Sequence, residues 1–321
     1  MRYRTFGRTK WKVSEVGYGM WGMAGWSGSD DEESLKSLQL AVDLGVNFFD
    51  TAWAYGDGHS ERLLGQILRA NPKKTLFAAT KVPPKNRKWP TDRGDKLGDV
   101  FPPEYIRDYA ERSVKNIGRV DLLQFHVWED AWATDDRWQR AIADLRADGL
   151  VRAVGVSINR WEPANAIDTL RTGLIDAVQV IYNIFDQSPE DELFPICREL
   201  DIGVIARVPF DEGSLTGTLT KDSKWPRGDY RSMYFGKENL GPTLKRVEAL
   251  RALVPKGSSL PELALRFILA TPDVDVVIPG MRKPAHVRTN VAVSDASPLT
   301  RDLIAELRQH RWDRTPAPWS A

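Results

Sequence analysis

The feature that most constrains the fold of this chain is a regular alternation of short apolar segments with longer amphipathic ones. Eight short segments rich in β-branched and aliphatic residues predict strands, at 14–18, 46–50, 76–80, 121–125, 151–157, 177–181, 203–207 and 274–278. Helical periodicity predicts helices between or after them, at 31–44, 60–69, 103–117, 135–148, 162–172, 190–200, 242–253, 261–270, 284–293 and 299–310. Alternating strands and helices imply right-handed parallel crossovers, and eight such units close into a (β/α)8 TIM barrel of the α/β class.

Segments outside the repeating units complete the predicted architecture. The opening RYRTFGRTKWKVSEV holds a Gly-Arg-Thr turn between two extended stretches and predicts an N-terminal β-hairpin before the first barrel strand. The helices beyond the repeating units are expected to add C-terminal helices to the barrel. No linker rich in proline, glycine or serine divides the 321 residues, so we expect a single barrel domain over 1–321.

Charge and cysteine content narrow the environment and the partners. The chain has 45 basic and 44 acidic residues, so no overall field attracts nucleic acid or an anionic membrane surface. Cys197 is the only cysteine, which excludes an internal disulfide and fits a reducing compartment. The opening MRYRTFGRTK lacks the apolar stretch of a signal peptide, and no run reaches the ~18 apolar residues of a membrane span. We therefore expect a soluble cytoplasmic protein that acts on a small molecule; the sequence does not distinguish a monomer from a homo-oligomer.

The segment VGYGMWGMAGW, residues 16–26, contains a G-x-G-x-x-G pattern at Gly17, Gly19 and Gly22. In a dinucleotide-binding Rossmann unit the last glycine opens a helix. Here glycine and serine continue after Gly22, and helical periodicity begins only near Asp31. The pattern therefore predicts a loop, although a nicotinamide can still bind elsewhere in the chain.

Four polar residues stand at or just after the ends of the second, third and fourth predicted strands: Asp50, Tyr55, Lys81 and His126. Barrel chemistry takes place at the carboxyl ends of the strands, and these strands are neighbours, so we expect the four side chains to converge. Tyrosine alone, with a pKa near ~10, is a weak acid, and an adjacent ammonium stabilises its phenolate. An aspartate to keep the lysine charged and a histidine to donate a second hydrogen bond complete a set that can protonate a developing alkoxide.

Each of the four has a simpler explanation when it is taken alone. A lysine that ends an apolar strand is usually a solvated cap, and a lone histidine beside Phe125 and Val127 is usually a wall residue. Asp50 can cap the turn that follows it, and Tyr55 can serve packing. Their joint occurrence at adjacent strand ends favours an active site.

The sequences around these residues, NFFDTAWAYGDGHSERLLG, ATKV and DLLQFHVW, resemble the aldo-keto reductase family, and the resemblance runs from Tyr3 to about His310. It implies a (β/α)8 barrel whose N-terminal hairpin closes the bottom. It also implies NADPH-dependent reduction of an aldehyde or ketone to an alcohol, in a reaction that can be reversible and needs no metal. Hydride then comes from the nicotinamide C4 and the proton from Tyr55. The implied catalytic residues are Asp50, Tyr55, Lys81 and His126.

The resemblance also implies the cofactor contacts. They fall at Met20, Trp21, Ser157, Asn159, Gln179, Arg207, Pro209, Phe210, Gly213, Leu215, Gly280, Met281, Arg282, His286 and Asn290. Two departures from the family pattern concern the nicotinamide. Ile158 separates a serine and an asparagine that are usually adjacent, and Arg207 stands where many members stack an aromatic ring, which a planar guanidinium can replace. Asp211 and Glu212 lie next to the implied pyrophosphate and are expected to point away from it.

The choice of NADPH is predicted from the segment after the last strand. Arg282 and Lys283 are adjacent cations suited to the 2′-phosphate, and Pro284 fits the first turn of a helix that follows them. No acidic residue occurs between Gly280 and Ser294 to bind the ribose hydroxyls of NADH.

The substrate is expected to rest on aromatic side chains in or after the strand-end loops. These are Trp21, Trp53, Trp89 and Trp128. The long polar loop 82–102 is expected to form part of a lid.

Two other functions stay open on the sequence alone. The barrel and its nicotinamide can serve to sense redox state for a partner protein, as potassium-channel β subunits of this superfamily are thought to do, although the intact set of four disfavours a purely binding role. An unrelated barrel hydrolase or aldolase would instead use Lys81 as a Schiff base. Turnover of a generic aldehyde distinguishes the reductase from the sensor, and borohydride trapping on Lys81 tests the aldolase.

Overall fold

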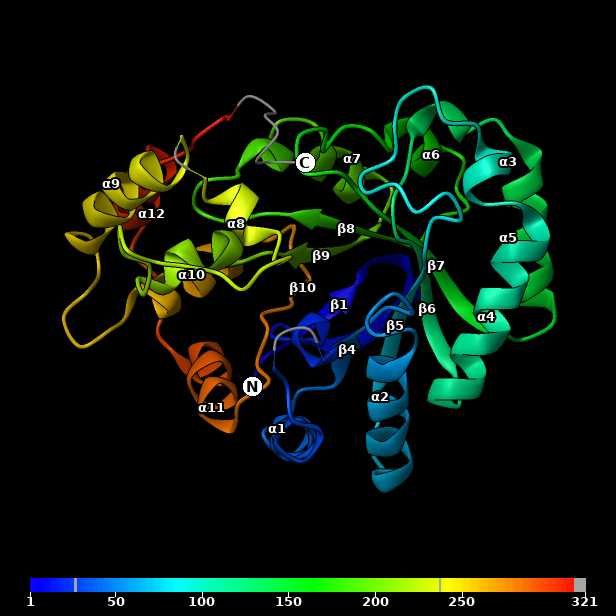
Figure 1. The fold of residues 1–321 in the computed structure, drawn as a ribbon, viewed down its shortest axis with the longest axis horizontal. Coiled ribbons are helices and arrows are strands. Elements are labelled where there is room, and N and C mark those ends of the chain that lie inside the picture. Colours follow the sequence, from blue (N-terminus) through cyan, green and yellow to red (C-terminus); the bar gives the residue numbers. More distant parts are fainter. Residues whose placement is uncertain (26–27, 237, 315–321) are drawn as a thin grey trace.

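The computed structural model describes residues 1–25, 28–236 and 238–314. Within them, eight parallel strands form the centre of the molecule (Figure 1). The strands are β3 (Tyr18–Gly19), β4 (Phe48–Asp50), β5 (Phe77–Val82), β6 (Val120–Phe125), β7 (Val151–Ser157), β8 (Ala177–Ile181), β9 (Gly203–Arg207) and β10 (Val276–Val277). They pair in chain order, and the bridges Val16–Val277 and Gly19–Gly280 join the two ends of the sheet. The predicted barrel is confirmed.

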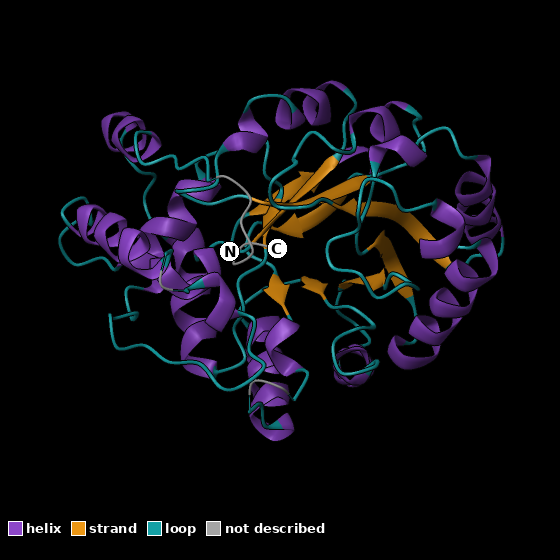
Figure 2. Ribbon diagram, turned by 45° about the horizontal axis from the view of Figure 1, so that its top comes forward, coloured by secondary structure: helices purple, strands orange, loops and turns teal. Residues whose placement is uncertain are grey.

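Helices surround these strands (Figure 2). The helices that follow successive strands are α1 (Asp31–Asp43), α2 (His59–Ala70), α4 (Pro103–Ile117), α5 (Asp136–Ala147), α6 (Ile167–Arg171), α7 (Leu193–Glu199), α10 (Leu260–Leu269) and α11 (Pro284–Ala292). Additional helices are α3 (Leu97–Val100), α8 (Arg231–Tyr234), α9 (Leu240–Arg251) and α12 (Arg301–Arg308). None of the helices in the described ranges has the length and apolar character needed to cross a membrane.

Local sequence accounts for where several helices begin and end. The carboxylate of Asp30 accepts the backbone N–H of Glu33 at 2.8 Å, which caps the start of α1. Pro103 occupies the first turn of α4, where its missing N–H costs no hydrogen bond. The same helix stops at Gly118, whose φ of 102° suits glycine.

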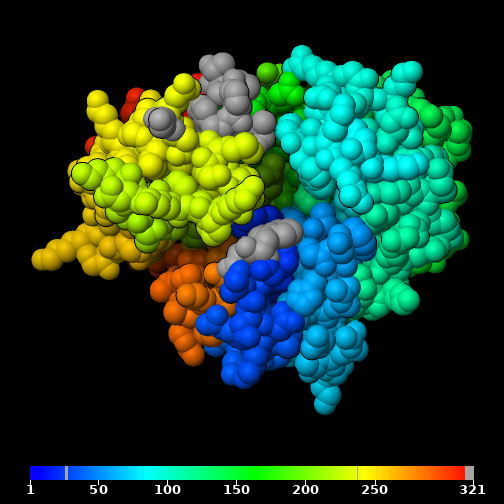
Figure 3. Space-filling view, in the orientation of Figure 1, coloured from blue at the N-terminus to red at the C-terminus, as the bar shows by residue number. Residues whose placement is uncertain are grey.

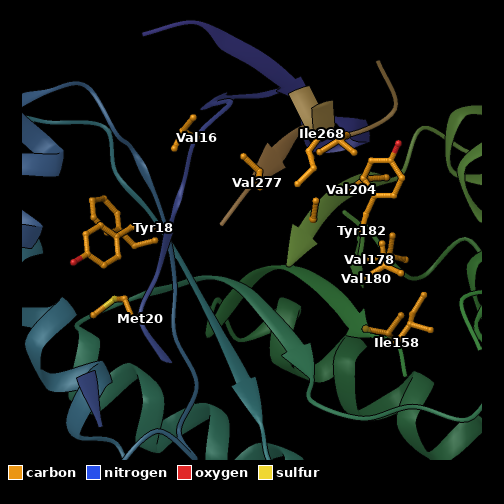
Figure 4. Packing of buried hydrophobic residues seen from close by; sticks show 14 of the residues in the cluster. Val16, Tyr18, Met20, Ile158, Val178, Val180, Tyr182, Val204, Ile268 and Val277 are labelled. Carbon is orange, nitrogen blue, oxygen red and sulfur yellow. The ribbon is translucent and has the colours of Figure 1, made fainter. Parts of the chain in front are cut away.

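Side chains alternate between two cores along the strands. On β8, Val178 and Val180 belong to the outer core between the barrel and its helices, whereas Ala177 belongs to the inner core. Figure 4 shows part of the outer core, including Val178 and Ile268 of α10. Because successive side chains point to opposite faces of a sheet, Gln179 points into the barrel.

The N-terminal hairpin closes one end of the barrel. Its strands β1 (Tyr3–Phe6) and β2 (Trp11–Ser14) are antiparallel, and Phe6 is fully buried. The ring centroid of Phe6 lies 5.5 Å from that of Phe48, which begins β4. A Cβ on Gly203, which begins β9, would come within 2.8 Å of the Phe6 ring. The hairpin therefore packs on the amino ends of the strands, as predicted, and leaves the carboxyl ends to form a site.

Some boundaries differ from the predicted ones. The first barrel strand covers only residues 18–19, because Ser14 belongs to the hairpin. Helix α6 starts at Ile167 and not at 162, because residues 163–166, which include a proline, form turns. The short helices α3 and α8 lie in segments for which no regular structure was predicted.

We expect replacement of Phe6 by alanine to destabilise the folded state by about 3–5 kcal/mol, because it leaves a cavity among buried rings. Urea unfolding at neutral pH measures this loss. Thr5→Ala is the control on the same strand: Thr5 is exposed, and its loss should change stability by no more than about 0.5 kcal/mol. Similar losses in both variants would show that the hairpin does not plug the barrel.

Candidate active site

A buried ion pair lies at the carboxyl ends of two neighbouring strands. Asp50 ends β4, and Lys81 is the penultimate residue of β5. The Lys81 Nζ donates to Asp50 Oδ2 at 2.6 Å and to the carbonyl oxygen of Thr51 at 2.8 Å. Neither Asp50 nor Lys81 is more than 2% exposed. Buried charges are tolerated when they are paired and hydrogen-bonded, so each of these two residues requires the other.

Two glutamines complete the hydrogen bonding of this carboxylate. Gln124 of β6 and Gln179 of β8 donate from Nε2 to Asp50 Oδ1, at 3.0 and 2.8 Å. Gln179 Nε2 also lies 3.2 Å from Gln124 Oε1. Inward side chains from β4, β5, β6 and β8 thus form one polar layer inside the barrel, with Asp50 at its centre.

Tyr55 lies next to the ion pair, in the loop after β4. The Lys81 Nζ is 5.3 Å from the centre of the Tyr55 ring, and a Lys81–Tyr55 side-chain hydrogen bond stabilises the phenolate. Burial nevertheless raises the pKa of Tyr55 above its ordinary value, and the Asp50 charge adds to this, while Lys81 and Arg207 oppose it. The expected lowering by Lys81 is present, but burial outweighs it. The phenol therefore carries its proton at neutral pH.

His126 is the first residue after β6, and its ring faces Tyr55. The centroids of the two rings are 5.7 Å apart, and the ring of Trp89 lies 4.6 Å away on an edge contact. Burial lowers the pKa of His126 well below its ordinary value, and the charges of Lys81 and Arg207 lower it further. Its Nδ1 is buried with no hydrogen-bond partner among the described residues. The imidazole is therefore neutral near pH 7.

These residues lie at one end of a cavity of about 790 Å³. The cavity runs from Tyr55, His126 and Trp89 to Arg282 and His286 at the start of α11. Figure 3 shows the surface hollowed where the blue segment after β3, the cyan loop after β5 and the yellow-green segment after β9 meet. A cavity of this size lies in the range that holds a small-molecule ligand or a cofactor.

Most of the predicted site residues line this cavity. They are Met20, Trp21, Asp50, Tyr55, Trp89, His126, Gln179, Arg207, Pro209, Phe210, Gly213, Gly280, Met281, Arg282 and His286. Those that do not line it are Trp53, Lys81, Trp128, Ser157, Asn159, Leu215 and Asn290. Lys81 still reaches the site through Asp50 and Tyr55, and Ser157 pairs with Gln179 across β7 and β8.

The structure corrects the expected position of two tryptophans. Trp128 is fully buried. Its indole N–H donates to Thr169 Oγ1 at 2.8 Å, and its ring packs 5.3 Å from that of Trp138 on α5. Trp53 packs against Tyr109 of α4, with ring centroids 4.8 Å apart. Both rings pack against side chains of the surrounding helices, and neither lines the cavity.

Arg207 ends β9 and lines the cavity beside the polar layer. Its Nη2 donates to the carbonyl oxygen of Ile158 at 3.1 Å, and its Nε is buried with no partner among the described residues. Burial lowers the pKa of Arg207, and the charge of Arg160 lowers it further. The half-buried guanidinium thus donates to one neutral acceptor.

The loop after β9 is fixed by a buried ionic cluster. Asp211, with a positive φ of 44°, accepts hydrogen bonds from Tyr234 at 2.6 Å, from Ser214 at 2.7 Å and from Arg314 at 3.1 Å. Arg314 also binds Asp186 in the loop after β8, at 2.7 Å. Asp211 therefore points away from the cavity, as expected.

Glu212 does not point away: it lines the cavity. It binds Arg160 Nη2 at 3.2 Å and accepts a hydrogen bond from the Tyr230 hydroxyl. Tyr230 and Arg231 also line the cavity, and the Tyr230 ring meets Trp21 edge-on at 5.9 Å. The sequence contained no motif that assigned Tyr230 or Arg231 to the site.

The loop after β5 reaches the cavity and is held in place by contacts with the segments after β6 and β7. Trp89 from this loop lines the cavity. Arg93 forms an ion pair with Glu162 in the segment after β7, and the backbone oxygen of Asp95 accepts the Trp132 indole N–H at 2.9 Å. The loop therefore forms one wall of the site, in the region predicted to be a lid.

Comparison with known proteins gives one family. The chain matches the profile of the Aldo/keto reductase family over residues 15–311. It is 29% identical to an NADH-specific methylglyoxal reductase of Escherichia coli K12, over 96% of this chain and 100% of that protein. It is 27% identical to the aldo-keto reductase yakc [NADP(+)] of Schizosaccharomyces pombe, over 89% of this chain and 86% of that protein. The solved structure of a glycerol dehydrogenase from Gluconobacter oxydans is similar to this one with a TM-score of 0.78 and 28% sequence identity. The match covers 99% of this chain and 97% of that chain. The chain therefore belongs to the aldo/keto reductase family of oxidoreductases.

Proposed function

We propose that this chain reduces an aldehyde or a ketone to an alcohol with NADPH, and that Tyr55 supplies the proton. The observation that carries the proposal is the buried Lys81–Asp50 pair, joined at 2.6 Å beside Tyr55, at the end of a cavity of about 790 Å³. Proton transfer to a carbonyl oxygen requires a proton donor beside a charge that stabilises the donor's anion, and Tyr55 and Lys81 supply these two groups.

Each of the four residues has a separate task in this proposal. Burial keeps the pKa of Tyr55 high, so the phenol holds a proton until negative charge develops on the substrate oxygen. Lys81 then stabilises the phenolate that forms, and Asp50 keeps Lys81 charged and oriented. The neutral His126 donates a hydrogen bond to the same oxygen without losing a proton.

A bound reduced nicotinamide supplies the hydride from its C4. Open space at two glycines of the cavity wall fits such a ligand, because a Cβ on Gly213 or Gly280 would meet no atom within 4 Å. The unpartnered Nε of Arg207 also fits a ligand that covers it. The residues proposed to hold the cofactor are Met20, Trp21, Ser157, Asn159, Gln179, Arg207, Pro209, Phe210, Gly213, Leu215, Gly280, Met281, Arg282, His286 and Asn290.

The proposed substrate is a small carbonyl compound. Trp21 and Trp89 are 39% and 46% exposed and line the cavity from the loops after β3 and β5. Large rings that are half exposed beside a polar layer favour a substrate with an apolar or aromatic part and one reactive oxygen.

Replacement of Tyr55 by phenylalanine should lower turnover of a generic aldehyde by about 100-fold or more, the usual contribution of a positioned acid. Cofactor affinity should stay nearly unchanged, because only a hydroxyl is removed. Absorbance at the nicotinamide band measures turnover, and fluorescence titration measures binding. Tyr3→Phe, on the hairpin at the opposite end of the barrel, is the matched control. Near wild-type turnover in Tyr55→Phe would reject the assignment.

The neutral state of His126 predicts a pH dependence of stability. Because burial lowers its pKa well below 6.5, the unfolded chain gains a proton on this histidine near pH 6 and the folded chain does not. The folded state should therefore lose up to about 1.4 kcal/mol per pH unit as the pH falls below about 6.5. His126→Gln should lack this contribution. Urea unfolding of both proteins at about pH 7.5 and about pH 5.5 tests it; equal losses in the two proteins would contradict a neutral His126.

Cofactor choice provides a further prediction. Arg282 lines the cavity where α11 begins, and charged hydrogen bonds to a 2′-phosphate contribute about 1.5–3 kcal/mol, which is roughly a 10- to 100-fold preference for NADPH over NADH. Arg282→Ala should remove most of this preference and leave NADH affinity almost unchanged. Arg288→Ala, an exposed cation on the same helix, is the control. Equal affinities for NADPH and NADH in the unmodified protein would refute the choice of NADPH.

A further inference from the structure

Arg207, a half-buried residue of the cavity wall, carries a poorly compensated charge. Its recorded hydrogen bond goes to the neutral carbonyl oxygen of Ile158, and its Nε has no partner in the described part of the chain. Within the residues that the structure describes, no carboxylate comes within 4.0 Å of its guanidinium. A half-buried cation in this state favours an anionic or neutral neighbour and disfavours a second cation.

Two other buried cations near the polar layer are already paired with carboxylates. Lys81 is paired with Asp50 at 2.6 Å. Arg160 lies 3.2 Å from Glu212 and 3.7 Å from Asp211. The charges of Glu212 and Asp50 also act on Arg207, but Glu212 is paired with Arg160 and Asp50 with Lys81. The field in this part of the cavity is therefore positive.

Arg207 lines the same cavity as Tyr55, close enough for its charge to act on the phenol. Hydride can reach a carbonyl carbon only if the ring lies next to the oxygen that Tyr55 protonates. Tyr55, Arg207 and Arg282 all line this one cavity. Arg207 stands beside Ile181 at the end of β8, one strand from Gln179, and its charge acts on the pKa values of both Tyr55 and His126.

We infer that Arg207 makes the cavity select the reduced form of the nicotinamide over the oxidised form. This inference rests on the proposed function. The dihydronicotinamide ring is neutral, whereas the oxidised pyridinium ring carries one positive charge. An uncompensated guanidinium beside the ring therefore repels the oxidised form and leaves the reduced form unaffected. The enzyme holds its reductant and releases the spent cofactor, which favours carbonyl reduction when both forms are present.

The test compares the ratio of the dissociation constants for the oxidised and reduced forms of one cofactor. The 2′-phosphate is the same in NADP⁺ and NADPH, so its contribution cancels in the ratio, and NAD⁺ with NADH form a second pair. Tryptophan fluorescence quenching measures all four constants in the unmodified protein, in Arg207→Met and in Arg207→Lys. We expect the ratio to fall by at least about 10-fold in Arg207→Met, which keeps an unbranched stem as far as the position of Nε and removes the charge. In Arg207→Lys the ratio should stay within about 3-fold of the unmodified value, because the charge is retained.

The outcomes separate this inference from the proposed function. If Arg207→Met binds both forms with an unchanged ratio while the unmodified protein still reduces an aldehyde, the inference is wrong and the reductase stands. If Arg207→Lys changes the ratio as much as Arg207→Met does, charge is not the cause and the inference is also wrong. If the unmodified protein binds neither NADPH nor NADH, both the inference and the proposed function fall. Thermal unfolding of each variant confirms that the folded protein is being titrated.

Discussion

The hydrogen bonds of the Asp50 carboxylate are the constraint around which the site is built. One carboxylate, placed at the end of β4, accepts from the Lys81 ammonium and from the amides of Gln124 and Gln179. Inward-facing side chains of four strands therefore form a single polar layer. It lies above an apolar inner core that includes Phe6 and Phe48. These hydrogen bonds fix the position of the Lys81 ammonium along the barrel axis. That position determines where the Tyr55 phenol, in the loop after β4, can interact with the ammonium.

Two cations beside the cavity, the buried Lys81 and the half-buried Arg207, have different consequences. Lys81 is matched by a carboxylate at 2.6 Å and lies 5.3 Å from the centre of the Tyr55 ring. Arg207 is held by a neutral carbonyl oxygen, so its charge extends into the cavity. His126 lies near both and stays neutral because burial and the two cations act in the same direction on its pKa. The proton donor Tyr55, the neutral His126 and the cation Arg207 can therefore line the same cavity.

The barrel and the four polar residues could be predicted because both follow from short-range pattern. Side chains alternate along a strand, and active sites of barrels lie at the carboxyl ends of the strands. These two rules place Asp50, Lys81 and His126 without knowledge of the loops. Glu212 and Tyr230 could not be placed, because the course of their segment depends on a buried contact between Asp211 and a residue far along the chain. Trp128 was misplaced because its ring turns toward α5 and Thr169, a packing choice that no local motif encodes. The net pKa of Tyr55 depends on burial, which a sequence does not give.

The contact between Asp211 and Arg314 spans 103 residues, and that between Asp186 and Arg314 spans 128. During synthesis on the ribosome, every barrel strand is complete before Arg314 has been made. Until then, two carboxylates that are buried in the finished protein have to remain hydrated or find other partners, and the loop that carries Phe210 and Gly213 lacks its anchor. The loop that lines the cavity therefore gains its contact with Arg314 only after every barrel strand has been synthesised.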